Sequence, residues 1–145
     1  MPRVVASTTI KRPVEEVFAV VSDATTGPKW RPSLLSVTKT SEGPTGVGTT
    51  YRSTGTMFGR HQDIEHTVTE FDVNRRFAVT ATKPFPITIT MALEPTADGT
   101  RLDMFADAKP GGFFRLAQPL MMAIGGRRNQ SDLEKLRDLI EAKTV

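Results

Sequence analysis

Histidine is the side chain of this chain best suited to proton transfer near neutral pH, and the sequence holds two. His66 lies in an alternating segment, in phase with Ile64 and Val68, so it is predicted to share their inward face. A histidine on such an apolar surface could act as a general acid or base, or it could be a buried structural residue. Asp63 and Glu65 have the opposite parity, so we expect no carboxylate on the same strand to orient His66.

A second group of polar and aromatic side chains could contact a ligand. Tyr51 and Ser53 share one face of a predicted strand with Met57. The Tyr51 hydroxyl could donate a hydrogen bond to a ligand oxygen, or it could reach water from a core or rim position. Trp30, the only tryptophan, could line a pocket entrance or attach a short helix to the sheet.

Several other chemistries have no support in the sequence. The chain has no cysteine, which excludes a disulfide framework, a thiolate nucleophile and cysteine ligands for zinc. His61 and His66 fall on opposite faces of one predicted strand, so we expect no metal site. The serines lack a G-x-S-x-G context, and the chain has neither a P-loop nor a dinucleotide-binding glycine motif. We therefore expect no cofactor.

The composition is that of an ordinary globular chain. Of its 145 residues, 38% are apolar and 24% are charged, and the formal net charge is +3. The basic residues are scattered, with the tightest pairs at Arg75-Arg76 and Arg127-Arg128, so we expect no nucleic-acid partner. We see no secretion signal and no apolar run long enough to span a membrane. We expect one domain over residues 1–145, in the cytoplasm, without stable membrane insertion, as a monomer or homodimer.

Hydrophobic periodicity predicts the order of the elements. A strand is predicted at 4–10, a helix from Pro13, and a short second helix at 24–30 that Pro32 ends. The period then changes to two, and apolar residues alternate with polar ones. The strands of this series are predicted at 35–37, at 48–57, from the tip at 58–60 to 71, and at 77–82, 87–94 and 101–108. This alternation predicts an antiparallel sheet with one solvated face.

The last element is predicted to be a long helix over residues 113–143, interrupted by Pro119 and by Gly125-Gly126. Its first half is apolar on almost every side, and its second half carries a narrow apolar stripe. The stripe consists of Leu133, Leu136 and Ile140. Such a helix needs an apolar surface to cover, and the concave face of the sheet is the candidate. The expected fold class is α+β, with a curved antiparallel sheet wrapped around the C-terminal helix.

Sheet and helix would enclose either a packed core or a cavity for an apolar ligand. In the second case, the wall consists of the inward strand positions and the first half of the helix. The predicted ligand-binding residues are Trp30, Tyr51, Ser53, Met57, Ile64, Met91, Met104, Phe113, Leu116, Leu120 and Met121, and the predicted catalytic residue is His66. The apolar half of the helix could move as a gate while the striped half stays docked.

Six stretches of the chain resemble those of one known superfamily in type, order and spacing. They are IKRPVEEVF at 10–18, VSD at 21–23 followed by Trp30, VGT at 47–49, VTEF at 68–71 followed by RRF at 75–77, GTRL at 99–102 and LEKLRDLIE at 133–141. They resemble the START-like (SRPBCC) superfamily, the helix-grip fold shared by Bet v 1-like allergens and bacterial polyketide cyclase/dehydrase-like proteins. The resemblance implies binding of lipids, sterols, polyketides or other hydrophobic molecules between sheet and helix. It transfers no catalytic residue, because these vary between subgroups.

Two functions therefore remain open. The chain could be a carrier or sensor of a small hydrophobic ligand, or a cyclase or dehydratase that acts on such a ligand in the same cavity. An enzyme needs convergent titratable groups, and His66 has no assured partner, which favours binding. A third class, a helper protein that binds another protein, would need a large exposed apolar patch. The polar outer parity of the strands argues against such a patch on the sheet.

Overall fold

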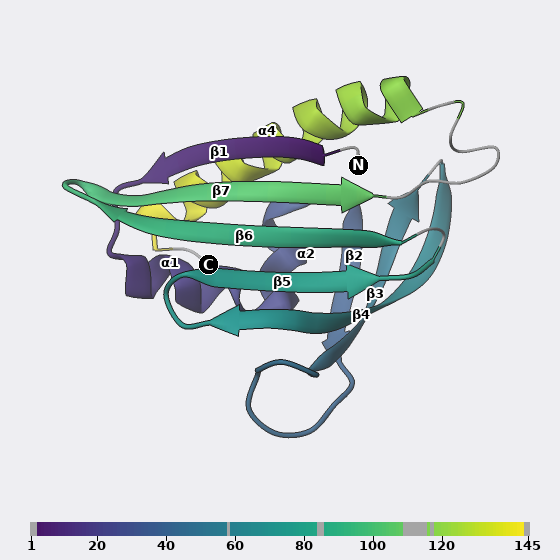
Figure 1. Cartoon of the computed structure of the whole chain (residues 1–145), viewed down its shortest axis with the longest axis horizontal. Helices are drawn as coiled ribbons and strands as arrows, with labels where there is room; N and C mark the ends of the chain where they lie inside the picture. The colour runs from purple at the N-terminus through teal and green to yellow at the C-terminus, as the bar shows by residue number, and fades with distance from the viewer. Residues whose placement is uncertain (1–2, 58, 84–85, 109–115, 117, 144–145) are drawn as a thin grey trace.

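The computed structural model describes residues 3–57, 59–83, 86–108, 116 and 118–143, without the side chains of Met57, Gln118 and Met121. The described elements are β1 (Arg3–Ile10), α1 (Val14–Val21), η1 (Ala24–Thr26), α2 (Gly27–Trp30), β2 (Leu34–Lys39), β3 (Thr50–Met57), β4 (Arg60–Asp72), β5 (Arg76–Ala81), β6 (Ile87–Thr96), β7 (Gly99–Ala108) and α4 (Gln118–Glu141). The strands form one antiparallel sheet in the order β1-β7-β6-β5-β4-β3-β2 (Figure 1). Consecutive strands from β2 to β7 are neighbours, as expected for a meander, and β1 is the edge strand next to β7.

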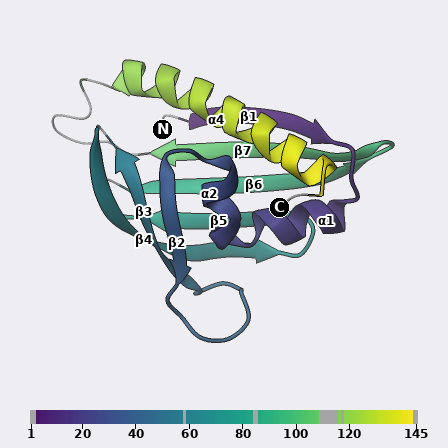
Figure 2. The same cartoon turned by 180° about the vertical axis from the view of Figure 1, so that it is seen from behind.

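The helices lie on one side of this curved sheet. Figure 2 shows α4 crossing in front of β1 and β7, with α1 and α2 beside it. The arrangement confirms the expected α+β helix-grip fold, in which the sheet curves around the long C-terminal helix. The sheet therefore has one face toward the helices and one face toward solvent.

The two short helices follow from local sequence signals. Helix α1 has Pro13 as its N-cap and two glutamates in its first turn, and it buries Val17, Phe18 and Val21. The Asp23 side chain caps η1, because its Oδ1 accepts a hydrogen bond from the Thr25 backbone N–H at 3.1 Å. These features confirm the predicted start of the first helix.

Helix α4 is continuous through Gly125 and Gly126, so the interruption expected there is wrong. Each glycine costs a helix about 1 kcal/mol relative to alanine, but this helix packs along β1, and Gly126 faces the Val4 side chain. Tertiary packing therefore compensates the weak helix propensity. The break expected at Pro119 adjoins residue 117, which lies outside the described residues.

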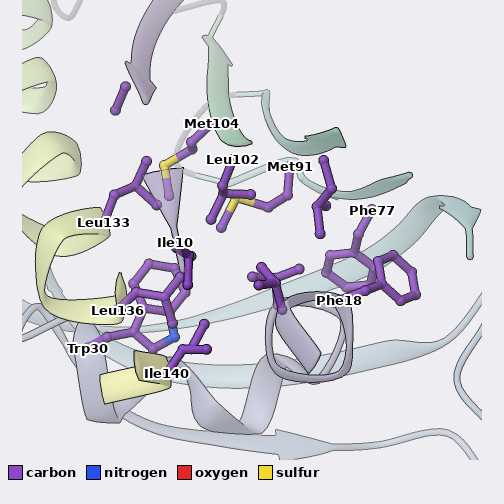
Figure 3. Close-up of a cluster of buried hydrophobic side chains, with 14 of the residues drawn as sticks. Ile10, Phe18, Trp30, Phe77, Met91, Leu102, Met104, Leu133, Leu136 and Ile140 are labelled. Carbon is purple, nitrogen blue, oxygen red and sulfur yellow. The ribbon is translucent and has the colours of Figure 1, made fainter. Parts of the chain in front are cut away.

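The packed core lies under the C-terminal half of α4. Leu133, Leu136 and Ile140 are almost completely buried, which confirms the predicted stripe. They belong to a cluster with the ends of several strands and with the helices, drawn in Figure 3. Further members of the cluster are Ile10, Phe18, Trp30, Phe77, Met91, Leu102 and Met104.

The turn between β6 and β7 brings the start of β7 against the end of β1. A Cβ atom on Gly99 would lie 2.1 Å from the carbonyl oxygen of Ile10, so only glycine fits there. Thr100 is fully buried, and its hydroxyl donates to the Arg12 carbonyl oxygen at 2.9 Å. The Gly-Thr pair at the head of the GTRL stretch therefore has a structural role.

Candidate functional site

A cavity of about 590 Å³ lies between the concave sheet face and the helices. Small-molecule pockets commonly have volumes of about 300–1,000 Å³. The walls come from the inward faces of β3 to β7, from α2 and its flanks, and from one face of α4. The residues that line it include Trp30, Arg31, Tyr51, Ser53, Ile64, His66, Phe77, Val79, Ala81, Ile87, Ile89, Met91, Ala106, Ala108, Met122, Ile124, Arg128 and Asn129.

The cavity exists because inward side chains become smaller toward one end of the sheet. On β7, Met104 is fully buried in the core, whereas Ala106 and Ala108 on the same face line the cavity. On β5, the inward series falls from phenylalanine through valine to Ala81, and on β3 it falls from tyrosine through serine to glycine. Ile87 is paired with both Ala81 and Ala108, so the small residues of β5 and β7 meet at the same end. Short side chains there leave space that longer ones fill beneath the striped half of α4.

One wall of the cavity carries polar groups on β3 and β4. His66 faces inward, as its parity predicts, and it lies opposite Tyr51 in the register. Its Nε2 atom forms a hydrogen bond with the Ser53 hydroxyl. Tyr51 and Ser53 are 2% and 1% exposed, so the Tyr51 side chain is a wall residue and is not solvated at a rim. The contact between Ser53 and His66 was not predicted from the sequence.

Two effects favour the neutral form of His66. Burial lowers the pKa of His66 below its ordinary value, and the positive charge of Arg31 lowers it further. A neutral imidazole can accept a proton through one ring nitrogen while the other donates. The side chain is therefore chemically able to act as a base inside the cavity.

A second polar wall joins α2 to α4 and was not predicted. Arg31 follows the last residue of α2, and its Nε lies 3.2 Å from Oδ2 of Asp132. One Nη atom of Arg31 donates to Oδ1 of Asn129 at 3.0 Å, and the guanidinium lies 5.7 Å from the centre of the Trp30 ring system. Asn129 and Asp132 are 6% and 4% exposed. Arg31 and Asn129 line the cavity, whereas Asp132 does not.

The Arg31–Asp132 pair is costly to bury. Desolvation is the largest influence on both groups: it raises the pKa of Asp132 and lowers the pKa of Arg31, against their mutual attraction. Both shifts oppose the charged forms, so the attraction does not fully offset the loss of hydration. A buried pair of this kind is weak evidence for a role in stability.

A signal for this wall was present in the helix periodicity. Asn129 lies four residues before Leu133, and Asp132 lies four residues before Leu136, so both continue the apolar stripe of α4. A polar residue on a buried stripe needs a partner. The identity of the partner, Arg31, could not be read from the sequence, because it depends on how α2 and α4 pack.

The structure sorts the predicted ligand-binding residues into three groups. Those that line the cavity are Trp30, Tyr51, Ser53, Ile64 and Met91, together with His66. Those that do not line it are Met104, Leu116 and Leu120. Those outside the described residues are Phe113 and the side chains of Met57 and Met121. Trp30 both lines the cavity and belongs to the core cluster.

The three misplaced residues have two physical causes. Met104 has the inward parity, but it lies where β7 is covered by the packed core. Leu116 and Leu120 are 87% and 64% exposed, and Met122 lines the cavity from α4 instead. The first half of the helix is apolar on almost every side, so periodicity does not indicate which side faces the sheet.

Two absences hold for the part of the chain that the structure describes. No group of three or more acidic or histidine side chains is placed to hold a metal ion in this part of the chain. None of the described helices is long and apolar enough to cross a membrane.

The family of the chain follows from a comparison with family models. The model described as polyketide cyclase / dehydrase and lipid transport matches residues 1–141. The chain belongs to this family. The match confirms the resemblance to START-like proteins of the polyketide cyclase/dehydrase type. No curated protein sequence matches the chain significantly.

Solved structures show the same fold at low sequence identity. Protein TTHA0849 from Thermus thermophilus has a TM-score of 0.82 at 19% identity, over 99% of this chain and 100% of that chain. The Zhui aromatase/cyclase from Streptomyces sp. R1128 has a TM-score of 0.80 at 15% identity, over 99% and 96%. Ara h 8.0201 has a TM-score of 0.63 at 18% identity, over 93% and 97%. At these identities the likeness shows the fold alone, which is the Bet v 1-like helix grip.

Proposed function

We propose that this protein binds a small hydrophobic ligand in the cavity between the sheet and helix α4, as a carrier or sensor. The observation that carries the proposal is the decrease in side-chain size toward one end of the sheet. Ala81, Ala106 and Ala108 stand where residues of ordinary core size would close the space. Membership of a family described by lipid transport and by polyketide cyclisation agrees with such a ligand.

The first experiment asks whether a ligand is already bound. Native mass spectrometry of freshly purified protein should show an additional mass that organic solvent removes. Trp30 provides an independent signal, because it is the only tryptophan and lines the cavity. Titration with the neutral apolar probe N-phenyl-1-naphthylamine should quench its fluorescence saturably.

A filling substitution tests whether binding occurs in this cavity. Ala106→Phe places a ring in the space, and we expect it to weaken probe binding by at least about tenfold, or ~1.4 kcal/mol. Ala92→Phe is the matched control, because Ala92 lies between two inward residues of β6 and faces the outer side. Equal probe affinity in the wild type and in Ala106→Phe would refute binding in this cavity.

A second candidate function, a cyclase or dehydratase, is favoured by one specific observation. His66 lies within the cavity, has a lowered pKa and contacts the Ser53 hydroxyl. If the protein is an enzyme, His66→Ala should lower turnover about 10²–10⁴-fold, the usual contribution of a general acid or base. If it is a carrier, the same change should cost on the order of 1 kcal/mol of affinity, which is one polar contact. A turnover assay on the co-purified molecule separates the two functions.

A further inference from the structure

We propose that the ligand is an amphipathic acid, whose carboxylate binds Arg31 at the α2–α4 wall while its apolar body lies along β5 to β7. This inference rests on the proposed function, and it adds the chemical class of the ligand. A charged side chain, Arg31, lines a mostly apolar cavity. The Arg31 side chain is 19% exposed, and it forms part of the cavity wall.

The hydrogen-bonding capacity of Arg31 is only partly used within the protein. A guanidinium carries five N–H donors in a planar fork. Among the described residues, one Nη of Arg31 donates to Asn129, and the Nε lies near Asp132 without a well-aligned hydrogen bond. The fork geometry suits bidentate binding of a carboxylate. The protein therefore holds a partly buried cation at the wall of a cavity, with Nη donors left for a ligand.

The charges around the cavity favour an anion. Of the described lining residues, Arg31 and Arg128 are cationic and Asp23 is the acidic one. The Asp23 carboxylate is exposed, and it accepts hydrogen bonds from the backbone and hydroxyl of Thr25. Asp132 does not line the cavity, so a ligand would meet the cationic side of the ion pair. A ligand amine would be repelled, and an uncharged alcohol would gain no ionic contact with Arg31.

The opposite wall can add a neutral contact. His66 and Arg31 both line the cavity, and the charge of Arg31 adds to the effect of burial in lowering the pKa of His66. A neutral His66 adds no charge and can hydrogen-bond to the same head group through Ser53 or directly. The alanines of β5 and β7 then leave room for the apolar body.

The test compares ligands that differ only in their head group. Dodecanoic acid, dodecanol and dodecylamine are titrated as competitors of N-phenyl-1-naphthylamine at about pH 8, where a carboxylic acid is ionised. We expect the wild type to bind the acid at least about tenfold more tightly than the alcohol, and to bind the amine most weakly. Arg31→Gln should remove the preference for the acid over the alcohol.

Two further variants keep the test decisive. Arg52→Gln is the matched control, because Arg52 is 60% exposed and pairs with Glu65 on the outer face, so this variant should keep the preference. Arg31→Gln leaves Asp132 unpaired and could unfold, so Arg31→Gln combined with Asp132→Asn removes both charges together. The double variant should fold and should also lack the preference.

The possible outcomes separate this inference from the proposed function. Equal affinity of the wild type for acid and alcohol would overturn the acidic ligand and leave a hydrophobic ligand intact. A preference that survives in both Arg31 variants would overturn the role of Arg31. If the neutral probe does not bind at all, both proposals fail.

Discussion

Removing Asp132 should destabilise the protein strongly, although the pair that it forms with Arg31 adds little stability. In Asp132→Ala the Arg31 guanidinium loses its counterion, although it still lies among buried groups. Breaking a buried pair in this way costs about 3–5 kcal/mol. Arg31 retains 19% exposure, so water partly hydrates the remaining charge, and we expect the lower end, about 3 kcal/mol.

This free energy corresponds to a large change in melting temperature. An unfolding entropy of roughly 2.1 cal/mol/K per residue, over 145 residues, gives about 0.3 kcal/mol/K. Asp132→Ala should therefore lower the Tm by roughly 10 °C. Thermal unfolding followed by circular dichroism measures this shift, and urea unfolding measures the free energy directly.

Two comparisons isolate the cause. Arg31→Met combined with Asp132→Leu should restore most of the lost stability, because an apolar pair avoids the desolvation that opposes both charges. Glu65→Ala removes a partner from an exposed pair, with 60% and 78% exposed side chains, and should cost no more than about 1 kcal/mol. A loss below about 1 kcal/mol for Asp132→Ala would mean that the pair is hydrated, and the reasoning would be wrong.

Three further predictions concern other parts of the chain. Gly99→Ala should lower the urea midpoint well below that of Gly46→Ala. A Cβ atom at position 99 would lie 2.1 Å from a backbone atom, whereas one at position 46 would meet nothing within 4 Å. Similar midpoints for the two variants would contradict this. Because the pKa of His66 is lowered from 6.5, the unfolded chain binds a proton that the native chain does not, so stability should fall as the pH drops below about 6.5. His66→Gln should reduce that slope in urea titrations, and equal slopes in wild type and His66→Gln would count against it. Hydrogen exchange should be faster in α4 before Gly125 than after it if the first half acts as a gate, and equal strong protection would exclude the gate.

The fold was predictable because its signals are local and repeated. Side chains along a strand point alternately to the two faces of the sheet, so the inward residues of β3 and β4 could be assigned without knowing which strands pair with them. The same parity placed His66 on the inner face. Family-like stretches along most of the chain agreed with the element order.

The parts of the site that escaped prediction depend on contacts between distant elements. Arg31 and Asp132 come from α2 and α4, and no period links them. Leu120 and Met122 are both apolar, and only the rotation of α4 against the sheet decides which one faces the cavity. Met104 and Ala106 share one parity, and the extent of the core along β7 separates them.

The pairing of β1 with β7 has a consequence for the order of folding. Arg3 pairs with Asp107 and Ile10 with Thr100, so the first strand finds its neighbour only after nearly all the other strands have been made. The other side of β1 depends on α4, where the Gln130 side chain bonds both the N–H and the carbonyl of Ser7. During synthesis the hairpins from β2 to β7 can form in succession, while β1 stays unpaired. Closing so long a loop is entropically costly and makes folding slow. The strand that comes first in the sequence is therefore the last to be paired, and its backbone groups lack a strand partner until β7 has been made.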